Sequence, residues 1–272
     1  MNICIAGKNN IAIDVCQYVV EHYPMATIYA LINRNESGED NWQRSYLKYI
    51  QSEPRVQLAT LEQMYEIENL IFLSVEFDRI IRPALFKTIF LYNIHFSLLP
   101  AYKGVYPSVW PILNGEEYAG VTLHKMDCGI DTGDIIAQKR IKLSLHETSF
   151  SLYTRLIEEG TKLVVKHIDR LIEKRFRSKQ QPIKGSTYYS KKSIDYANLS
   201  IDLNVTAAQL DRQIRAFYFP AYQIAIVHGY QIIRTHILKE KSTEKPGTIL
   251  KENDKYIKIA TIDYNIKLYK NE

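Results

Sequence analysis

An amide and an imidazole side chain stand two residues apart in the stretch NIHFSLLPAYKG (93–104), directly after the apolar run TIFLY. Residues two apart on a β-strand project from the same face of the sheet, so Asn93 and His95 point in the same direction. The apolar run predicts a buried strand, and ligands of open α/β sheets bind at the carboxyl ends of such strands. Asn93 and His95 are therefore expected at a functional site.

A second polar cluster, MDCGIDTGD (126–134), holds Asp127, Asp131 and Asp134 among glycines. Such sequences often form plain turns, and no glutamate closes the twelve-residue ligand set of a calcium loop. A carboxylate of this loop, placed near His95, is suited to orienting the imidazole and stabilising its charge.

An amide, an imidazole and a carboxylate together suit the transfer of an acyl group to an amine. The amide N–H donates to the oxyanion of the tetrahedral intermediate. The imidazole takes or relays the proton of the attacking nitrogen, and the carboxylate holds the charge and tautomer of the imidazole. No nucleophilic Ser or Cys is required if the amine attacks directly.

The elements that must position these residues alternate between apolar runs and helical or polar stretches. The pattern predicts a mostly parallel α/β sheet that is covered on both faces. Its strands are expected at 2–6, 26–32, 56–60, 69–75 and 89–95. Beyond them we predict a short helix at 108–115, strands at 119–127 and 134–143, and a long helix at 149–176.

The polar stretch SKQQPIKGS (178–186) contains Pro182 and Gly185 and is predicted to be a linker. After it come a helix at 207–217, a hairpin at 222–238 and three short strands. The sequence thus predicts two domains, an α/β domain over 1–180 and a small, mostly β domain over 181–272.

Composition narrows the functional classes. The 272 residues carry a net charge of +5, which suits an anionic ligand without requiring nucleic acid. The three cysteines are far apart and form no CxxC pair, which argues against a disulfide framework or a zinc site and favours a reducing cytoplasm. No signal peptide and no apolar run of membrane-spanning length is present, so no membrane partner is expected.

The first strand-to-helix turn reads GKNN and lacks the G-x-G-x-x-G of dinucleotide-binding folds, which argues against a dehydrogenase. Lys8, Asn9 and Asn10 still lie where a strand meets a helix N-terminus, a natural place for an anion. The alternative for these three residues is helix capping beside a surface lysine.

The stretch NIHFSLLPAYKGVYPSVWPILNG (93–115), followed by AGVTLHKMDCGIDTGDII (119–136), resembles the folate-dependent formyltransferases. The resemblance implies a Rossmann-like catalytic domain, 10-formyltetrahydrofolate as co-substrate and no metal. It also implies that Asn93, His95 and Asp131 are the catalytic residues. Two positions depart from the family pattern, because Phe96 replaces a common proline and Lys103 replaces an arginine.

The same resemblance places the pterin of the folate against the end of the strand before the catalytic strand and against the Asp-containing loop. The side chains expected there are Ser74, Val75, Glu76, Phe77 and Asp127. Much of this contact is expected from the backbone, and 72–75 also has the plain interpretation of a buried strand end.

The C-terminal part, through 186–196 and 214–229, looks like the nucleotide-sugar N-formyltransferases, which formylate dTDP- or UDP-linked amino sugars. A pyrimidine base needs an aromatic face, which Phe217, Tyr218 and Tyr222 are expected to supply. The diphosphate needs cations, for which the candidates are Lys8, Lys103 and Arg215. The alternatives are core packing for the aromatic residues and a solvated face for the cations.

The best candidate acceptor is dTDP-4-amino-4,6-dideoxyglucose, used for O-antigen or other surface polysaccharide, with a dTDP-3-amino sugar as the alternative. A methionyl-tRNA or ribonucleotide formyltransferase is a further alternative, against which stands the absence of a lysine-rich insertion. A non-catalytic binding protein would not need Asn93, His95 and Asp131 together. A two-fold homodimer through the C-terminal sheet is also expected.

Overall fold

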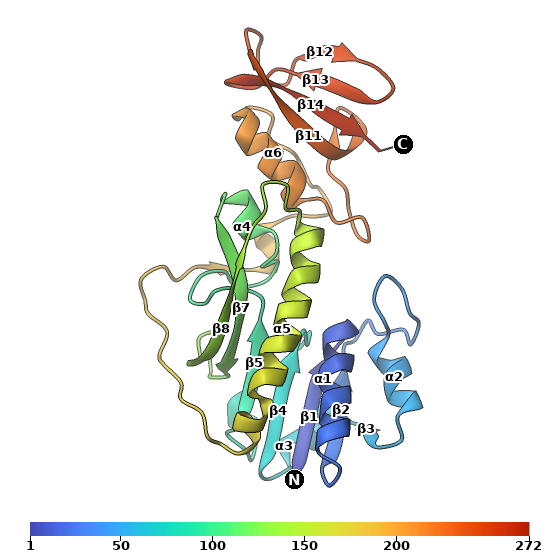
Figure 1. Ribbon diagram of the computed structural model, residues 1–272, viewed down its shortest axis with the longest axis vertical. Helices are drawn as coiled ribbons and strands as arrows, with labels where there is room; N and C mark the ends of the chain where they lie inside the picture. The colour runs from blue at the N-terminus through green and yellow to red at the C-terminus, as the bar shows by residue number, and fades with distance from the viewer. Residues whose placement is uncertain (272) are drawn as a thin grey trace. The chain divides into compact units, whose positions relative to one another are not determined.

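The computed structural model describes residues 1–271 (Figure 1). The chain divides into two compact units. The first comprises Met1–Gly104, Gly120–Ile141 and Arg155–Tyr188, and the second comprises Val105–Ala119, Lys142–Thr154 and the chain from Tyr189 onward. The second unit therefore draws two segments from the first 180 residues of the chain.

A seven-stranded sheet forms the centre of the first unit, in the order β3-β2-β1-β4-β5-β7-β8. The first five strands along this order are parallel, and β7 runs antiparallel to β5. Their bounds are β1 Asn2–Gly7, β2 Thr27–Ile32, β3 Val56–Leu58, β4 Leu70–Val75, β5 Leu91–His95, β7 Tyr118–Lys125 and β8 Ile135–Lys142. The predicted mostly parallel sheet is confirmed, and the continuous burial of β1 and β4 follows from their unbroken apolar sequences.

Helices cover this sheet, and two of them, α1 and α5, lie side by side over one face (Figure 1). The absence of a side chain at Gly160 lets α5 approach the sheet closely, since an added Cβ would lie 3.1 Å from Phe96 and 3.3 Å from Ile11. Thr60 and Gln63 form a capping box at the start of α3. The helices of this part are α1 Asn9–His22, α2 Tyr46–Ser52, α3 Leu61–Tyr65, α5 Ser149–Ile172 and the 3-10 turn η1 Pro83–Leu85, while the short helix α4 Trp110–Leu113 belongs to the second unit.

The second unit is built on a five-stranded sheet in the order β10-β11-β14-β13-β12, whose strand pairs are antiparallel. Helix α6, Ala207–Ala216, packs on one face of it, and Leu210 and Ile214 are buried there. This confirms the predicted small β-rich part. The remaining bounds are β10 Ile226–Val227, β11 Tyr230–Lys241, β12 Ile249–Glu252, β13 Tyr256–Ile259, β14 Tyr264–Lys270, η2 Lys191–Ser193 and the short pair β6 Lys103–Gly104 with β9 Tyr188–Tyr189.

Within residues 1–271, no helix is long and apolar enough to cross a lipid bilayer.

The close approach of β1 and β4 makes Gly7 a sensitive position. A Cβ at Gly7 would lie 1.9 Å from the main-chain oxygen of Val75, its register partner. Because that oxygen belongs to the backbone, no rotamer change relieves the overlap, and we expect Gly7→Ala to lower the free energy of unfolding by about 2–3 kcal/mol.

Thermal unfolding of Gly7→Ala measures this cost, with Gly160→Ala as the matched control. The added Cβ at position 160 meets only side chains, and a gain of about 1 kcal/mol in helix propensity offsets the crowding. Equal melting temperatures for Gly7→Ala and the wild type would contradict the backbone overlap.

Candidate active site

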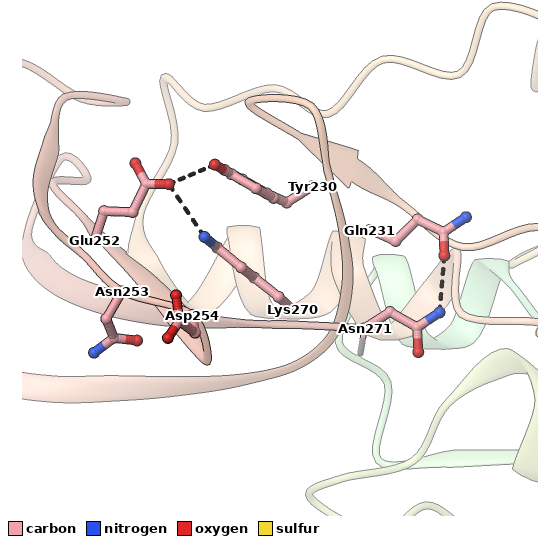
Figure 2. Close-up of a pocket in the computed structure, with 7 residues that line it drawn as sticks. All are labelled: Tyr230, Gln231, Glu252, Asn253, Asp254, Lys270 and Asn271. Carbon is pink, nitrogen blue, oxygen red and sulfur yellow. Dashed lines mark hydrogen bonds and ion pairs between the residues drawn. The ribbon is translucent and has the colours of Figure 1, made fainter.

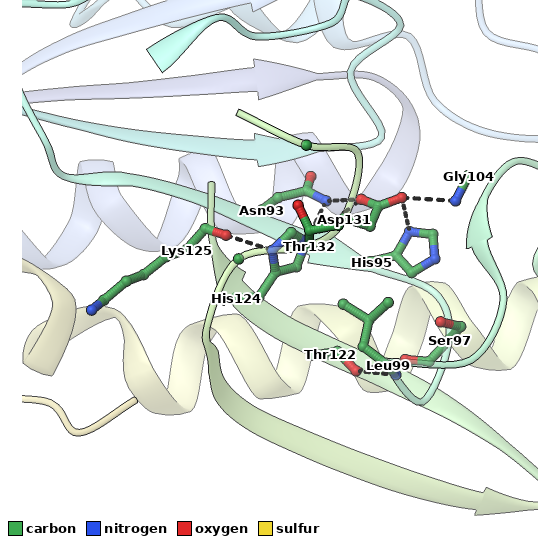
Figure 3. A network of polar contacts seen from close by, with 12 residues as sticks. Asn93, His95, Ser97, Leu99, Gly104, Thr122, His124, Lys125, Asp131 and Thr132 are labelled. Atoms are coloured by element: carbon green, nitrogen blue, oxygen red, sulfur yellow. Dashed lines mark hydrogen bonds and ion pairs between the residues drawn. The ribbon is translucent and has the colours of Figure 1, made fainter. Parts of the chain in front are cut away.

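The carboxyl end of β5 carries the first two candidate residues, and its neighbour β7 adds a third. Asn93 is the register partner of His124, and His95 is the register partner of Thr122. Directly opposed residues of an antiparallel pair share one face of the sheet. Asn93, His95 and His124 are therefore gathered on one face, as Figure 3 shows.

The loop between β7 and β8 brings Asp131 to this cluster. Its backbone has φ +54°, in the left-handed region that Asp tolerates better than most residues. One carboxylate oxygen, Oδ2, accepts a hydrogen bond from the Gly104 N–H at 2.9 Å and lies 3.5 Å from His95 Nδ1. The other, Oδ1, lies 3.4 Å from Asn93 Nδ2 and 3.6 Å from His124 Nε2 (Figure 3).

The surroundings keep the Asp131 carboxylate charged. Burial by itself raises the pKa of this carboxyl, but its neighbours, chiefly His95 and also the hydrogen-bonding Gly104 N–H, lower it by more. The net result is a pKa well below the ordinary value for aspartate. Asp131 is thus an anion at neutral pH, held in a mostly buried site.

His95 is held between two oxygen acceptors. Its Nε2 atom lies 2.8 Å from the main-chain oxygen of Tyr102, and its Nδ1 atom faces Asp131. Only a doubly protonated imidazole can donate to both oxygens. The two oxygens are thus placed to accept both N–H groups of a protonated His95.

His124 fixes the orientation of the Asn93 amide. Its Nδ1 atom lies 2.6 Å from the main-chain oxygen of Lys125, so in the neutral ring the proton is on Nδ1 and Nε2 is an acceptor. Asn93 Nδ2 donates to that Nε2 atom at 3.0 Å. The sequence analysis did not select His124, although Thr122 and His124 repeat the two-residue spacing of Asn93 and His95.

The residues expected to contact folate lie beside this cluster. Ser74 and Val75 are buried at the end of β4, and Ser74 is the register partner of Asn93. Glu76 follows with φ +64°, and its main-chain oxygen accepts a hydrogen bond from the Asn33 side chain. Phe77 is half-buried beyond it.

The Asp127 side chain stabilises the turn of its own loop. Its Oδ1 atom accepts hydrogen bonds from the Gly129 N–H and from the Thr132 hydroxyl. These bonds shape the turn that leads to Asp131. Contact of Asp127 with folate stays a prediction, as it does for Ser74, Val75, Glu76 and Phe77.

Of the four candidate substrate residues of the first unit, Asn10 and Lys103 have protein partners for their side chains. Lys8 is the N-cap residue of α1, and Asn9 follows it with φ +60°. Asn10 Oδ1 accepts two hydrogen bonds from Arg44. Lys103 is only 8% exposed, and its ammonium donates to the Ser186 hydroxyl at 2.9 Å. Lys8 has no such bond among the described contacts, so it suits an anion best.

The candidates of the second unit differ in exposure. The Arg215 guanidinium pairs with Asp211 at 2.8 Å and donates to the main-chain oxygen of Glu147, so it is committed inside the unit. Phe217 is buried, whereas Tyr222 is 67% exposed. The main-chain oxygen of Tyr218 accepts from Ser149. Exposure therefore favours Tyr222 for stacking, and the binding roles of all four residues stay predictions.

A hollow of about 510 Å³ lies in the second unit, apart from every candidate residue (Figure 2). Tyr230 and Lys270 both donate to Glu252 there, and Asn271 donates to Gln231. Its polar groups largely satisfy one another, and it lacks the cluster of amide, imidazole and carboxylate. In the described part of the chain, no group of three or more His, Cys, Asp or Glu residues could hold a metal ion.

A mostly parallel α/β sheet with an amide, an imidazole and a buried carboxylate at one strand end defines a catalytic domain for acyl transfer. Models of the formyl transferase family match both parts of the chain, the formyl transferase domain over residues 30–168 and the formyl transferase C-terminal domain over residues 193–271. The chain belongs to the formyltransferase family and is an N-formyltransferase.

Two solved structures are similar over nearly the whole chain. The N-formyltransferase of Helicobacter canadensis, in complex with folinic acid and dTDP-3-aminofucose, is 37% identical, with a TM-score of 0.91 and 99% of each chain covered. WlaRD, a sugar 3N-formyl transferase, is also 37% identical, with a TM-score of 0.90 and coverage of 99% of this chain and 97% of that one. The methionyl-tRNA formyltransferase of Clostridium beijerinckii is 27% identical over 96% of this chain and 88% of its own.

The low pKa of Asp131 predicts a specific dependence of stability on pH. The unfolded carboxyl titrates near 3.9, while the folded one stays ionised to lower pH. The stability that Asp131 contributes should be fully present above about pH 5 and be lost as the pH falls from about 4 toward the folded pKa.

Urea unfolding of the wild type and Asp131→Asn at several pH values isolates this contribution, because the variant cannot titrate at this position. The difference in unfolding free energy between the two proteins should shrink in acid. A difference that stays constant from pH 7 to pH 3 would refute the lowered pKa.

Proposed function

We propose that this formyltransferase transfers the formyl group of 10-formyltetrahydrofolate to the amino group of a dTDP-linked amino-dideoxyhexose. The observation that carries the proposal is the convergence of Asn93, His95 and Asp131 in a chain 37% identical, over 99% of its length, to two such sugar-related enzymes. Both relatives were solved with a formylated folate, and one was solved with a dTDP-linked amino sugar.

The residues present fit this chemistry. The sugar nitrogen attacks the formyl carbon, a C–N bond forms, and the bond from that carbon to the folate nitrogen then breaks. Asn93 donates its amide N–H to the oxyanion; of its two contacts, the 3.4 Å contact to Asp131 is the longer and the easier to exchange. His95 accepts the proton of the attacking amine and delivers it to the departing folate nitrogen, and Asp131 stabilises the intervening imidazolium.

The ring position of the acceptor amine is best assigned to C3. The sequence analysis favoured a 4-amino sugar, but the two structures at 37% identity concern dTDP-3-aminofucose and a 3N-formyl transfer. The 4-N formyltransferase of Francisella tularensis is 22% identical and supports the fold alone. We therefore propose a dTDP-3-amino-3,6-dideoxyhexose, with the 4-amino isomer as the alternative.

Incubation with 10-formyltetrahydrofolate and single acceptors tests the proposal. We expect a mass gain of one formyl group on dTDP-3-amino sugars, with a higher kcat/KM than on the 4-amino isomers. Preference for a 4-amino sugar would correct the ring position only. Formylation of methionyl-tRNA and of no nucleotide sugar would overturn the acceptor class.

Substitutions at the cluster test the catalytic roles. His95→Asn and Asp131→Ala should each lower kcat by at least about a hundredfold, the usual scale of acid–base and oxyanion contributions. The exposed residues His146 and Asp254 supply matched controls, His146→Asn and Asp254→Ala, which should leave turnover unchanged. Near wild-type turnover in folded His95→Asn and Asp131→Ala would reject the assigned roles.

A further inference from the structure

Residues 178–187, which comprise the predicted linker 178–186 and Thr187, lie along the candidate active site. We call this segment the strap. It leaves the end of α5 as an extended coil, drawn in yellow to orange in Figure 1. Its polar groups make hydrogen bonds to the loop that carries Asp131 and to the loop of residues 100–104, whose backbone contacts His95 and Asp131.

The first half of the strap fastens the loop of Asp131. Lys179 and Ile135 exchange two main-chain hydrogen bonds, at 2.8 and 2.9 Å. The amide of Gln181 then donates to two main-chain oxygens, those of Asp131 and Gly133, both at 2.8 Å. Gln181 thus holds the backbone on which the catalytic carboxylate stands, without touching the carboxylate.

The second half of the strap fastens the loop of residues 100–104. The Thr187 hydroxyl accepts a hydrogen bond from the Tyr102 N–H at 2.7 Å, and the Thr187 main-chain oxygen accepts from the Lys103 N–H at 3.0 Å. This loop supplies the Tyr102 oxygen that faces His95 and the Gly104 N–H that donates to Asp131.

The two fastened residues share an unfavourable backbone conformation. Tyr102 has φ +60° and Asp131 has φ +54°, and neither is a glycine. Such conformations persist only where the surroundings over-determine them. Thr187 binds the main-chain N–H of Tyr102, and Gln181 binds the main-chain oxygen of Asp131, so the strap bonds directly to both strained positions.

We propose that Gln181 and Thr187 are positioning residues, which keep Asp131 and Tyr102 in the left-handed conformations that aim the carboxylate and the carbonyl at His95. The strap is then part of the catalytic machinery rather than a passive connection. The catalytic consequence rests on the proposed function, whereas the effect on the two loops does not.

Four variants separate positioning from general stability. Gln181→Ala removes both donors, and Gln181→Glu places an acceptor against two main-chain oxygens. Thr187→Val removes the hydroxyl at nearly constant volume, while Thr187→Ser keeps it. Gln180→Ala, at an exposed neighbouring position, is the matched control.

We expect Gln181→Ala, Gln181→Glu and Thr187→Val to lower kcat by about 10–100-fold, the scale of a misplacement near 1 Å. KM for the nucleotide sugar should change less than threefold, and the melting temperature should stay near that of the wild type. Thr187→Ser should retain most of the turnover, and Gln180→Ala should retain all of it. Wild-type kcat in Gln181→Ala and Thr187→Val would overturn the catalytic role of the strap.

Hydrogen–deuterium exchange supplies a readout that does not depend on the acceptor. In Gln181→Ala and Thr187→Val, peptides covering 100–104 and 129–133 should exchange faster, while peptides of β1 and β4 remain as in the wild type. If the wild-type enzyme were inactive on every sugar but the two variants still showed this faster exchange, the proposed function would fail and the positioning of the loops would stand. Unchanged exchange in both loops would overturn the positioning.

Discussion

The burial of one negative charge is the constraint on which the site of this formyltransferase depends. A carboxylate removed from water is costly unless it is paired and hydrogen-bonded. Asp131 meets that requirement with groups from two separate segments, namely the Gly104 N–H and the side chains of His95 and Asn93 near the end of β5. Each group that donates to the carboxylate is also held in place by it. The position of the Asp131 carboxylate and the orientation of the His95 imidazole therefore depend on each other.

The sheet and the shared face of Asn93 and His95 were predictable because both follow from local periodicity, whereas Asp131 was selected among three aspartates by the family resemblance. Unbroken apolar runs gave the parallel strands, and the two-residue spacing put Asn93 and His95 on one face. The contacts that other polar side chains make inside the protein were not predictable in this way. Residue type alone does not show whether Arg215 faces a ligand or pairs with Asp211. Nor does it show whether residues 178–187 only connect two elements or also hold the loop of Asp131, because that depends on contacts between distant segments. The same holds for the two segments, 105–119 and 142–154, that join the second unit.

The two departures from the family pattern have structural partners inside the first unit. Phe96 is 5% exposed and lies against α5 at Gly160. The absence of a side chain at Gly160 leaves room for the phenyl ring, which is larger than the proline of the family pattern. Lys103 is buried with its ammonium on Ser186 of the strap. Phe96 thus serves packing, and Lys103 serves attachment of its loop to the strap. The residues that select the acceptor amine are better sought among exposed side chains.

The long sequence separation between the strap and the loops it holds also sets the order in which the parts of the site are synthesised. Gln181 lies 50 residues after Asp131, and Thr187 lies 85 residues after Tyr102. Because domains begin to fold from the N-terminus during synthesis, the strands of the parallel sheet leave the ribosome before the strap. A nascent chain that ends before the strap therefore contains Asn93, His95 and Asp131 but lacks the hydrogen bonds from Gln181 and Thr187 to the two loops.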